Sequence, residues 1–110
     1  MGSMSIPVPN IFPATTGPAS SEEFLTLLEN GQIKIERILS HGQASAKDFW
    51  YDQPNDEWVL LLQGEAVLEF EGVGMTALVT GSYLHMQRHL RHRVEATSQD
   101  AVWLAIHFLG

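Results

Sequence analysis

The segment AVLEFE, residues 66–71, indicates the fold class because its apolar and polar side chains alternate. Ala66, Leu68 and Phe70 fall on one face, and Glu69 falls on the other. Successive side chains of a β-strand point to opposite faces of the sheet. The segment is therefore predicted to be an antiparallel strand with one face buried and the other in water.

Most of the chain divides into further segments of this kind. They are short, rich in Val, Ile, Leu and aromatic residues, and separated by turn signals such as Gln63-Gly64 and Thr80-Gly81-Ser82. The expected strands lie near 33–39, 46–51, 57–63, 65–71, 75–79, 83–88, 91–96 and 101–108. Short strands with tight turns in one small domain are typical of a sandwich or closed barrel, because these architectures leave few exposed edges.

The residues before this β-rich region have a different character. Met1 to Ser3 resemble a remnant of cloning, and residues 4–19, with four prolines, are expected to form an extended arm. Ser20 then has the spacing of a helix N-cap that forms a capping box with Glu23, and Asn30-Gly31 supplies a stop. We therefore expect a short helix over 20–29, which belongs to a single domain spanning 20–110.

Composition limits the function. The chain has 110 residues, 45% of them hydrophobic, which suits one globular domain. It has no cysteine, no signal-peptide pattern and no apolar run near the ~20 residues that span a bilayer. Its net charge of -7 opposes binding to nucleic acid or to anionic lipid. These features predict a cytoplasmic protein without a nucleic-acid or membrane partner.

The last expected strand, 101–108, is apolar on both faces. One face should line the barrel, so the other needs a cover, which the arm, the helix or a second subunit could supply. Trp50 and Trp58 are expected on the outer side of their own strands. Together these features predict a homodimer.

The chain resembles the single-domain cupins, which are jelly-roll β-barrels. In the family's first motif, G-x5-H-x-H-x3-4-E-x6-G, Glu57 and Gly64 match. In its second motif, G-x5-P-x-G-x2-H-x3-N, Gly81 and His92 match at the right separation. The resemblance covers roughly residues 33–108. It implies an all-β, cupin-type barrel and an interior site in which three histidines and one glutamate hold a divalent metal.

The departures from these motifs bear on the chemistry. The two histidine positions of the first motif hold Tyr51 and Gln53, so only Glu57 and His92 carry over as ligands. Gln53 has a weakly coordinating amide oxygen, and His89 lies three residues before His92. The resemblance thus implies Glu57, His92, Gln53 and His89 as candidate metal ligands for Zn, Mn, Ni or Fe. Whether an ion is bound is left open.

Two classes of function remain open. The first is an enzyme that acts on a small anionic or oxygenated molecule through a metal ion or an acid–base pair, with Glu57 as base, His92 as its proton partner and Tyr51 as a hydrogen-bond donor. The second is a metal-free module that binds or senses a small molecule. The candidate contacts to the ligand are Tyr51, Gln53, His85, Arg88 and His107.

Overall fold

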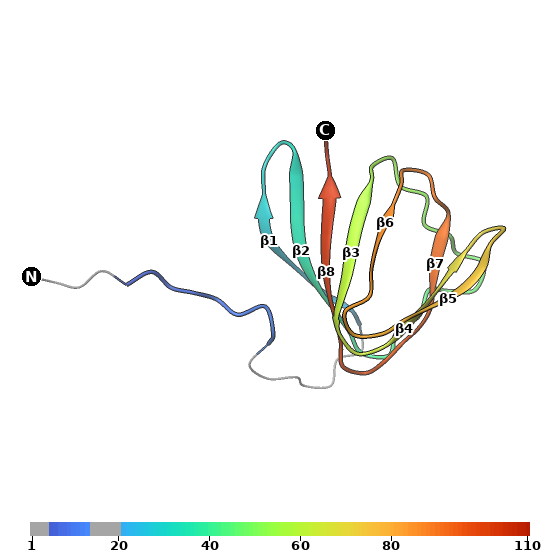
Figure 1. Cartoon of the computed structure of the whole chain (residues 1–110), viewed down its shortest axis with the longest axis horizontal. Helices are drawn as coiled ribbons and strands as arrows, with labels where there is room; N and C mark the ends of the chain where they lie inside the picture. Colours follow the sequence, from blue (N-terminus) through green and yellow to red (C-terminus); the bar gives the residue numbers. More distant parts are fainter. Residues whose placement is uncertain (1–4, 14–20) are drawn as a thin grey trace, which may run out of the picture.

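The computed structural model describes residues 5–13 and 21–110 and contains two antiparallel sheets. Figure 1 shows them as the two sides of a barrel. The five-stranded sheet has the order β1 (Glu23–Glu29), β2 (Ile33–Ser40), β8 (Ala101–Phe108), β3 (Glu57–Gln63) and β6 (Tyr83–Met86). The three-stranded sheet has the order β5 (Gly74–Leu78), β4 (Ala66–Phe70) and β7 (His92–Thr97). The expectation of an all-β cupin-type barrel is confirmed.

The predicted helix over 20–29 is wrong, because residues 23–29 form the edge strand β1. This strand pairs antiparallel with β2 along its length, from Glu23 opposite Leu39 to Glu29 opposite Lys34. Asn30-Gly31 makes the hairpin turn between them: the Asn30 Oδ1 atom accepts hydrogen bonds from the backbone N–H groups of the two residues after Gly31. Asn-Gly is a strong hairpin signal as well as a helix stop, and pairing with β2 decides between the two. Ser20, the expected N-cap, lies outside the described residues.

The predicted strand over 46–51 is also wrong. Its residues form a loop with a turn in which Phe49 N–H donates to Ala46 C=O, and Asp48 has a left-handed φ of 69°. Only Tyr51 pairs with a strand, through an isolated antiparallel bridge to His92. The other predicted strands are confirmed within a few residues of their bounds.

The arm contacts the outside of the five-stranded sheet. Its described part, residues 5–13, contains no strand or helix, and the Arg37 Nη1 group donates a hydrogen bond of 3.2 Å to Ile11 C=O. The remainder of the expected arm, Met4 and residues 14–19, lies outside the described residues. Nowhere in 5–13 or 21–110 is there a helix long and apolar enough to cross a membrane.

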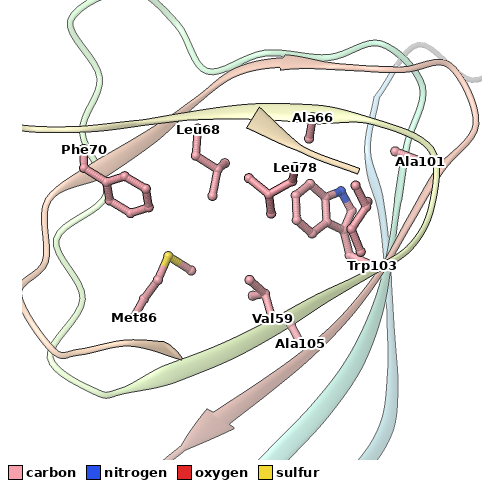
Figure 2. Packing of buried hydrophobic residues seen from close by; sticks show 10 residues of the cluster. Val59, Ala66, Leu68, Phe70, Leu78, Met86, Ala101, Trp103 and Ala105 are labelled. Carbon is pink, nitrogen blue, oxygen red and sulfur yellow. The ribbon is translucent and has the colours of Figure 1, made fainter. Parts of the chain in front are cut away.

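The core lies between the sheets and consists of alternate, inward-facing side chains (Figure 2). Ala66, Leu68 and Phe70 of β4 are buried, as the alternation predicts, and they face Val59 and Leu61 of β3 and Trp103 of β8. Gly64, between β3 and β4, has a φ of +95°, and an added Cβ would lie 2.9 Å from the Ala101 Cα atom. This match to the first motif is therefore a structural requirement of the turn.

Candidate functional site

A cavity of about 120 Å³ opens between the two sheets above the apolar core. Its floor includes the core residues Val59, Leu68 and Trp103. Its polar wall side chains come from both sides of the barrel. Since inward positions on neighbouring strands are otherwise apolar, the polar groups in this cavity identify it as the candidate site.

Three polar side chains stand side by side on the five-stranded sheet. His107 on β8 lies between Glu36 on β2 and Glu57 on β3, because β8 is the neighbour of both strands. The His107 Nε2 atom is 2.8 Å from Glu36 Oε1, and its Nδ1 atom is 3.9 Å from Glu57 Oε1. Both carboxyl groups are buried, with exposed fractions of 8% for Glu36 and 7% for Glu57. The imidazole therefore lies between two buried carboxyl groups and is hydrogen-bonded to one of them, Glu36.

Burial raises the pKa of Glu57 above its ordinary value. The nearby His107 acts in the opposite direction, and the negative charge of Glu36 raises the pKa further. A carboxyl group shielded from water favours its neutral form. Glu57 therefore holds its proton to a higher pH than an exposed glutamate does.

Tyr51 and His92 form the facing wall. Their backbones exchange two hydrogen bonds, of 2.7 and 3.1 Å, and their rings stack with centroids 5.4 Å apart. The His92 Nδ1–H group donates to Leu90 C=O at 2.8 Å, which leaves the lone pair of this histidine on Nε2. The pKa of Tyr51 is raised by burial and by the charges of Glu22 and Glu57, so Tyr51 stays a neutral phenol and a hydrogen-bond donor.

Two further glutamates line the cavity without having been predicted, Glu36 and Glu22. Glu22, just before β1, accepts a 2.8 Å hydrogen bond from the Ser40 hydroxyl, and Ser40 in turn accepts one from Trp103 Nε1 at 3.2 Å. Glu36 shares a face with the apolar Ile38 on a predicted strand, and this inward position was a usable signal. The sequence around Glu22 gave no such signal, because this segment resembled a helix.

The structure brings some predicted site residues to the cavity and leaves others outside. Glu57, His92, Tyr51, Gln53 and His107 line it. His85, Arg88 and His89 do not: His85 and Arg88 contact Asp56, and His89 contacts Asp52, with all three side chains at least half exposed. The strand β6 ends at Met86, and His89 has a left-handed φ of 63° in the turn that follows. His85 is exposed because it alternates with the buried Met86 on β6, and Arg88 and His89 are exposed in the turn that follows.

The cavity residues do not fit the metal site that the family resemblance implies. Of its four ligand positions, two hold the neutral phenol of Tyr51 and the amide of Gln53. His107 Nε2 is already bonded to Glu36. Within residues 5–13 and 21–110, no group of three or more His, Cys, Asp or Glu side chains is placed to hold an ion. A transition-metal site needs three or four such donors at about 2.0–2.3 Å.

Comparison with known proteins identifies the family. No family model and no curated protein sequence matches the chain. Among solved structures, a protein of Ralstonia eutropha JMP134, provisionally named a mannose-6-phosphate isomerase, is 44% identical with a TM-score of 0.87, covering 93% of this chain and 97% of that one. A cupin superfamily protein of Desulfitobacterium hafniense DCB-2 is 21% identical with a TM-score of 0.73, covering 87% and 84% of the two chains.

More distant structures agree on the fold. KdgF from Halomonas sp. is 13% identical with a TM-score of 0.71, covering 86% of each chain, and at this identity the likeness concerns the fold alone. The chain belongs to the cupin superfamily and is a single-domain cupin.

Proposed function

We propose that this cupin binds a small oxygen-bearing molecule in its barrel and transfers protons on that molecule through Glu57 and His107, without a metal ion. The observation that carries the proposal is the row of Glu36, His107 and Glu57 on the cavity wall, with separations of 2.8 and 3.9 Å. A hydrogen-bonded imidazole beside a carboxyl group of raised pKa is a common form of acid–base site.

Each member of the row has a distinct part. A carboxylate only accepts hydrogen bonds, so His107 donates its Nε2–H to Glu36 and keeps a lone pair on Nδ1. That lone pair is on the side of Glu57. Glu57, with its raised pKa, is the proton donor, and His107 is the acceptor. Glu36 positions the imidazole without touching the ligand.

The gap between His107 and Glu57 leaves room for a carbonyl group of the ligand. At 3.9 Å, their Nδ1 and Oε1 atoms are too far apart for a direct hydrogen bond. A carbonyl oxygen of the ligand can accept the proton of Glu57 at about 2.8 Å, the usual hydrogen-bond length, while the carbon next to that carbonyl gives its proton to the lone pair of His107 Nδ1. Tyr51 and Gln53 on the cavity wall supply further polar contacts.

The 44% identical relative supports this reaction type. Its name is that of an isomerase, and interconversion of an aldose and a ketose is a proton transfer, which an acid–base pair can carry out. The phosphate in that name finds no counterpart in the cavity, where no lysine or arginine lines the described part.

Solvent deuterium exchange tests the proposal across a range of possible substrates. The chain is incubated in D₂O with a panel of small aldoses, ketoses and hydroxyketones, and NMR follows deuterium incorporation next to the carbonyl group. We expect catalysed exchange for at least one compound and its loss in Glu57→Gln and His107→Gln. His85→Gln is the control, because His85 is exposed outside the cavity.

Exchange that survives both cavity substitutions would refute the proposed roles. The absence of exchange with every compound that binds would point instead to a binding or sensing module without turnover.

We further propose that two copies of the chain pair through the outer face of the five-stranded sheet. Leu25 and Leu28 of β1 are about half exposed there, at 47% and 52%. In register they lie opposite Arg37 and Ile35 of β2, on the face that continues to Ile106 of β8. An exposed apolar sheet face of this kind is typical of an interface between subunits.

A further inference from the structure

The carboxyl groups that line the cavity are not balanced by lysine or arginine side chains among the lining residues that the structure describes. Glu22, Glu36 and Glu57 all line it, whereas no lysine or arginine does so within residues 5–13 and 21–110. The stretches 1–4 and 14–20 contain no lysine, arginine or histidine at all. The other titratable groups on the wall are Tyr51, which stays neutral, and the imidazoles of His92 and His107.

The basic side chains of the protein are engaged elsewhere. Three arginines pair with acids outside the cavity: Arg88 with Asp56, Arg91 with Glu71, and Arg93 with Glu69 and Glu95. Arg37 donates to the arm, and Lys47 lies exposed in the loop before Tyr51. Lys34 is the nearest to the cavity wall, with its Nζ atom 3.8 Å from Glu36 Oε2. An anionic ligand would therefore meet carboxylates in the cavity and no guanidinium to bind it.

Glu22 differs from the other two glutamates in its partners. Glu36 is bonded to His107 and close to Lys34, and the pKa of Glu57 is raised by burial. In contrast, Glu22 accepts a hydrogen bond only from the neutral hydroxyl of Ser40 among the contacts of the described residues. Its negative charge reaches the facing wall, where it raises the pKa of Tyr51. A half-buried carboxylate without a cationic partner attracts a positive group.

Aromatic rings near Glu22 add to the preference of the cavity for a cation. Phe24 follows Glu22 by two residues and lines the cavity, as do Tyr51 and Trp103. Trp103 is tied to Glu22 through the hydroxyl of Ser40. The faces of aromatic rings attract cations, most strongly where water is scarce.

Resting on the proposed function, we propose that the ligand of this cavity is a small organic cation, an ammonium compound that also carries a hydroxyl or carbonyl oxygen. Glu22 and the neighbouring aromatic rings bind the ammonium group, and the oxygen lies between Glu57 and His107. The cavity of about 120 Å³ is smaller than the ~300–1,000 Å³ typical of sites for drug-sized ligands, so the ligand is an amine of only a few carbon atoms.

Three probes of equal length test the charge preference: 3-amino-1-propanol, 1,3-propanediol and 3-hydroxypropionate. Each has a hydroxyl group at one end, and the other end is cationic, neutral or anionic at pH 7. Titration followed by amide chemical shifts gives Kd values and maps the shifts onto the barrel. We expect the amine to bind in the cavity at least tenfold more tightly than the diol, and the carboxylate not to bind.

A pair of variants assigns the preference to Glu22. We expect Glu22→Gln to weaken binding of the amine about tenfold and to leave binding of the diol unchanged. Glu65→Gln is the matched control, because it removes the same charge from an exposed residue outside the cavity lining. Melting temperatures of both variants show whether either substitution has disturbed the fold.

The inference is overturned if the amine does not bind, if the carboxylate binds as tightly as the amine, or if Glu22→Gln behaves like Glu65→Gln. These outcomes are distinct from a failure of the proposed proton transfer. The His107→Gln variant should lose deuterium exchange but still bind the amine more tightly than the diol. The preference for a cation and the catalysis can therefore be tested separately.

Discussion

His107 and Glu36 share a 2.8 Å hydrogen bond on the inner face of the barrel, although 71 residues separate them in the chain. The antiparallel pairing of β8 with β2 places both side chains on the same face. Each also has a second charged neighbour, Glu57 at 3.9 Å from His107 and Lys34 at 3.8 Å from Glu36. The bond holds a polar pair in a largely apolar interior, and its loss should therefore be measurable.

The first prediction concerns this pair. Glu36→Gln and His107→Gln should each lower the free energy of unfolding by about 1–3 kcal/mol, because each leaves a buried polar partner without its charge-assisted bond. The double variant should lose less than the sum of the two, with a coupling of at least about 0.5 kcal/mol. Urea denaturation measures all four proteins. Additive effects would mean that the two side chains do not act as a pair.

The second prediction follows from the raised pKa of Glu57. A raised folded-state pKa means that the folded protein binds the proton more tightly than the unfolded chain does. The stabilisation that this tighter proton binding gives the fold is complete below the pKa of the unfolded chain, near 4.5. It is lost as the pH rises through the pKa of Glu57 in the folded protein. Glu57→Gln cannot ionise, so the variant should gain stability relative to the original protein between pH 4 and 8. Thermal melts across that range give the difference in melting temperature between the variant and the original protein. A difference that becomes smaller as the pH rises would contradict the prediction.

The third prediction concerns metal ions. Since the residues of the cavity do not match a three-histidine, one-glutamate site, treatment with EDTA should leave the melting temperature unchanged. Added Zn²⁺, Mn²⁺, Ni²⁺ or Fe²⁺ should not raise it specifically. An ion present at 100 times its Kd would stabilise the fold by about 2.7 kcal/mol, which is easily detected. A stabilisation that disappears in His92→Ala would establish a metal site and refute this prediction.

The fourth prediction concerns Gly64. Gly64→Ala should destabilise the fold by more than the ~1–3 kcal/mol of backbone strain alone, because the new Cβ would lie 2.9 Å from Ala101 Cα at a φ of +95°. Gly72→Ala is the control, since Gly72 has a φ of +78° but nothing within 4 Å of an added Cβ. Equal losses of unfolding free energy in the two variants would show that the contact with Ala101 is unimportant.

The fifth prediction concerns the assembly. Light scattering should give twice the chain mass of 12.2 kDa at micromolar concentration. Leu25→Glu with Leu28→Glu should give the monomer, because two charges would then lie on the apolar outer face. Val73→Glu should leave the dimer intact, since Val73 is 81% exposed in the turn between β4 and β5. A monomer mass for the unsubstituted chain would exclude the dimer.

The fold was predictable from local alternation, but the first strand was not. Within residues 20–31 the spacing of Ser20 and Glu23 satisfies a helix start, while Asn30-Gly31 satisfies both a helix end and a hairpin. Only the partner strand β2 decides between them, and that pairing is tertiary information. Local propensity is a weak signal when a neighbouring strand is available.

The site was predictable only in part. Glu57 and His92 were found through motif registers, which fix positions in the barrel. Glu36 was missed because its role depends on His107 beside it in the sheet. His85 was predicted to line the cavity from its strand, but it lies on the exposed face of β6, opposite to the buried Met86. His89 was predicted from its spacing to His92, but it lies in an exposed turn.

The position of β8 has a consequence for how the barrel assembles. This strand is the last of the eight in the described residues, but it lies in the middle of its sheet, between β2 and β3. The hairpin of β1 and β2 and the sheet of β4, β5 and β7 can each form from nearby segments. The five-stranded sheet must instead wait for residues 101–108, so strand pairing across it is slow and depends on long loop closures. On a translating ribosome the chain would therefore carry two unjoined halves, and Glu36 and Glu57 would become neighbours of His107 only after this final strand inserts.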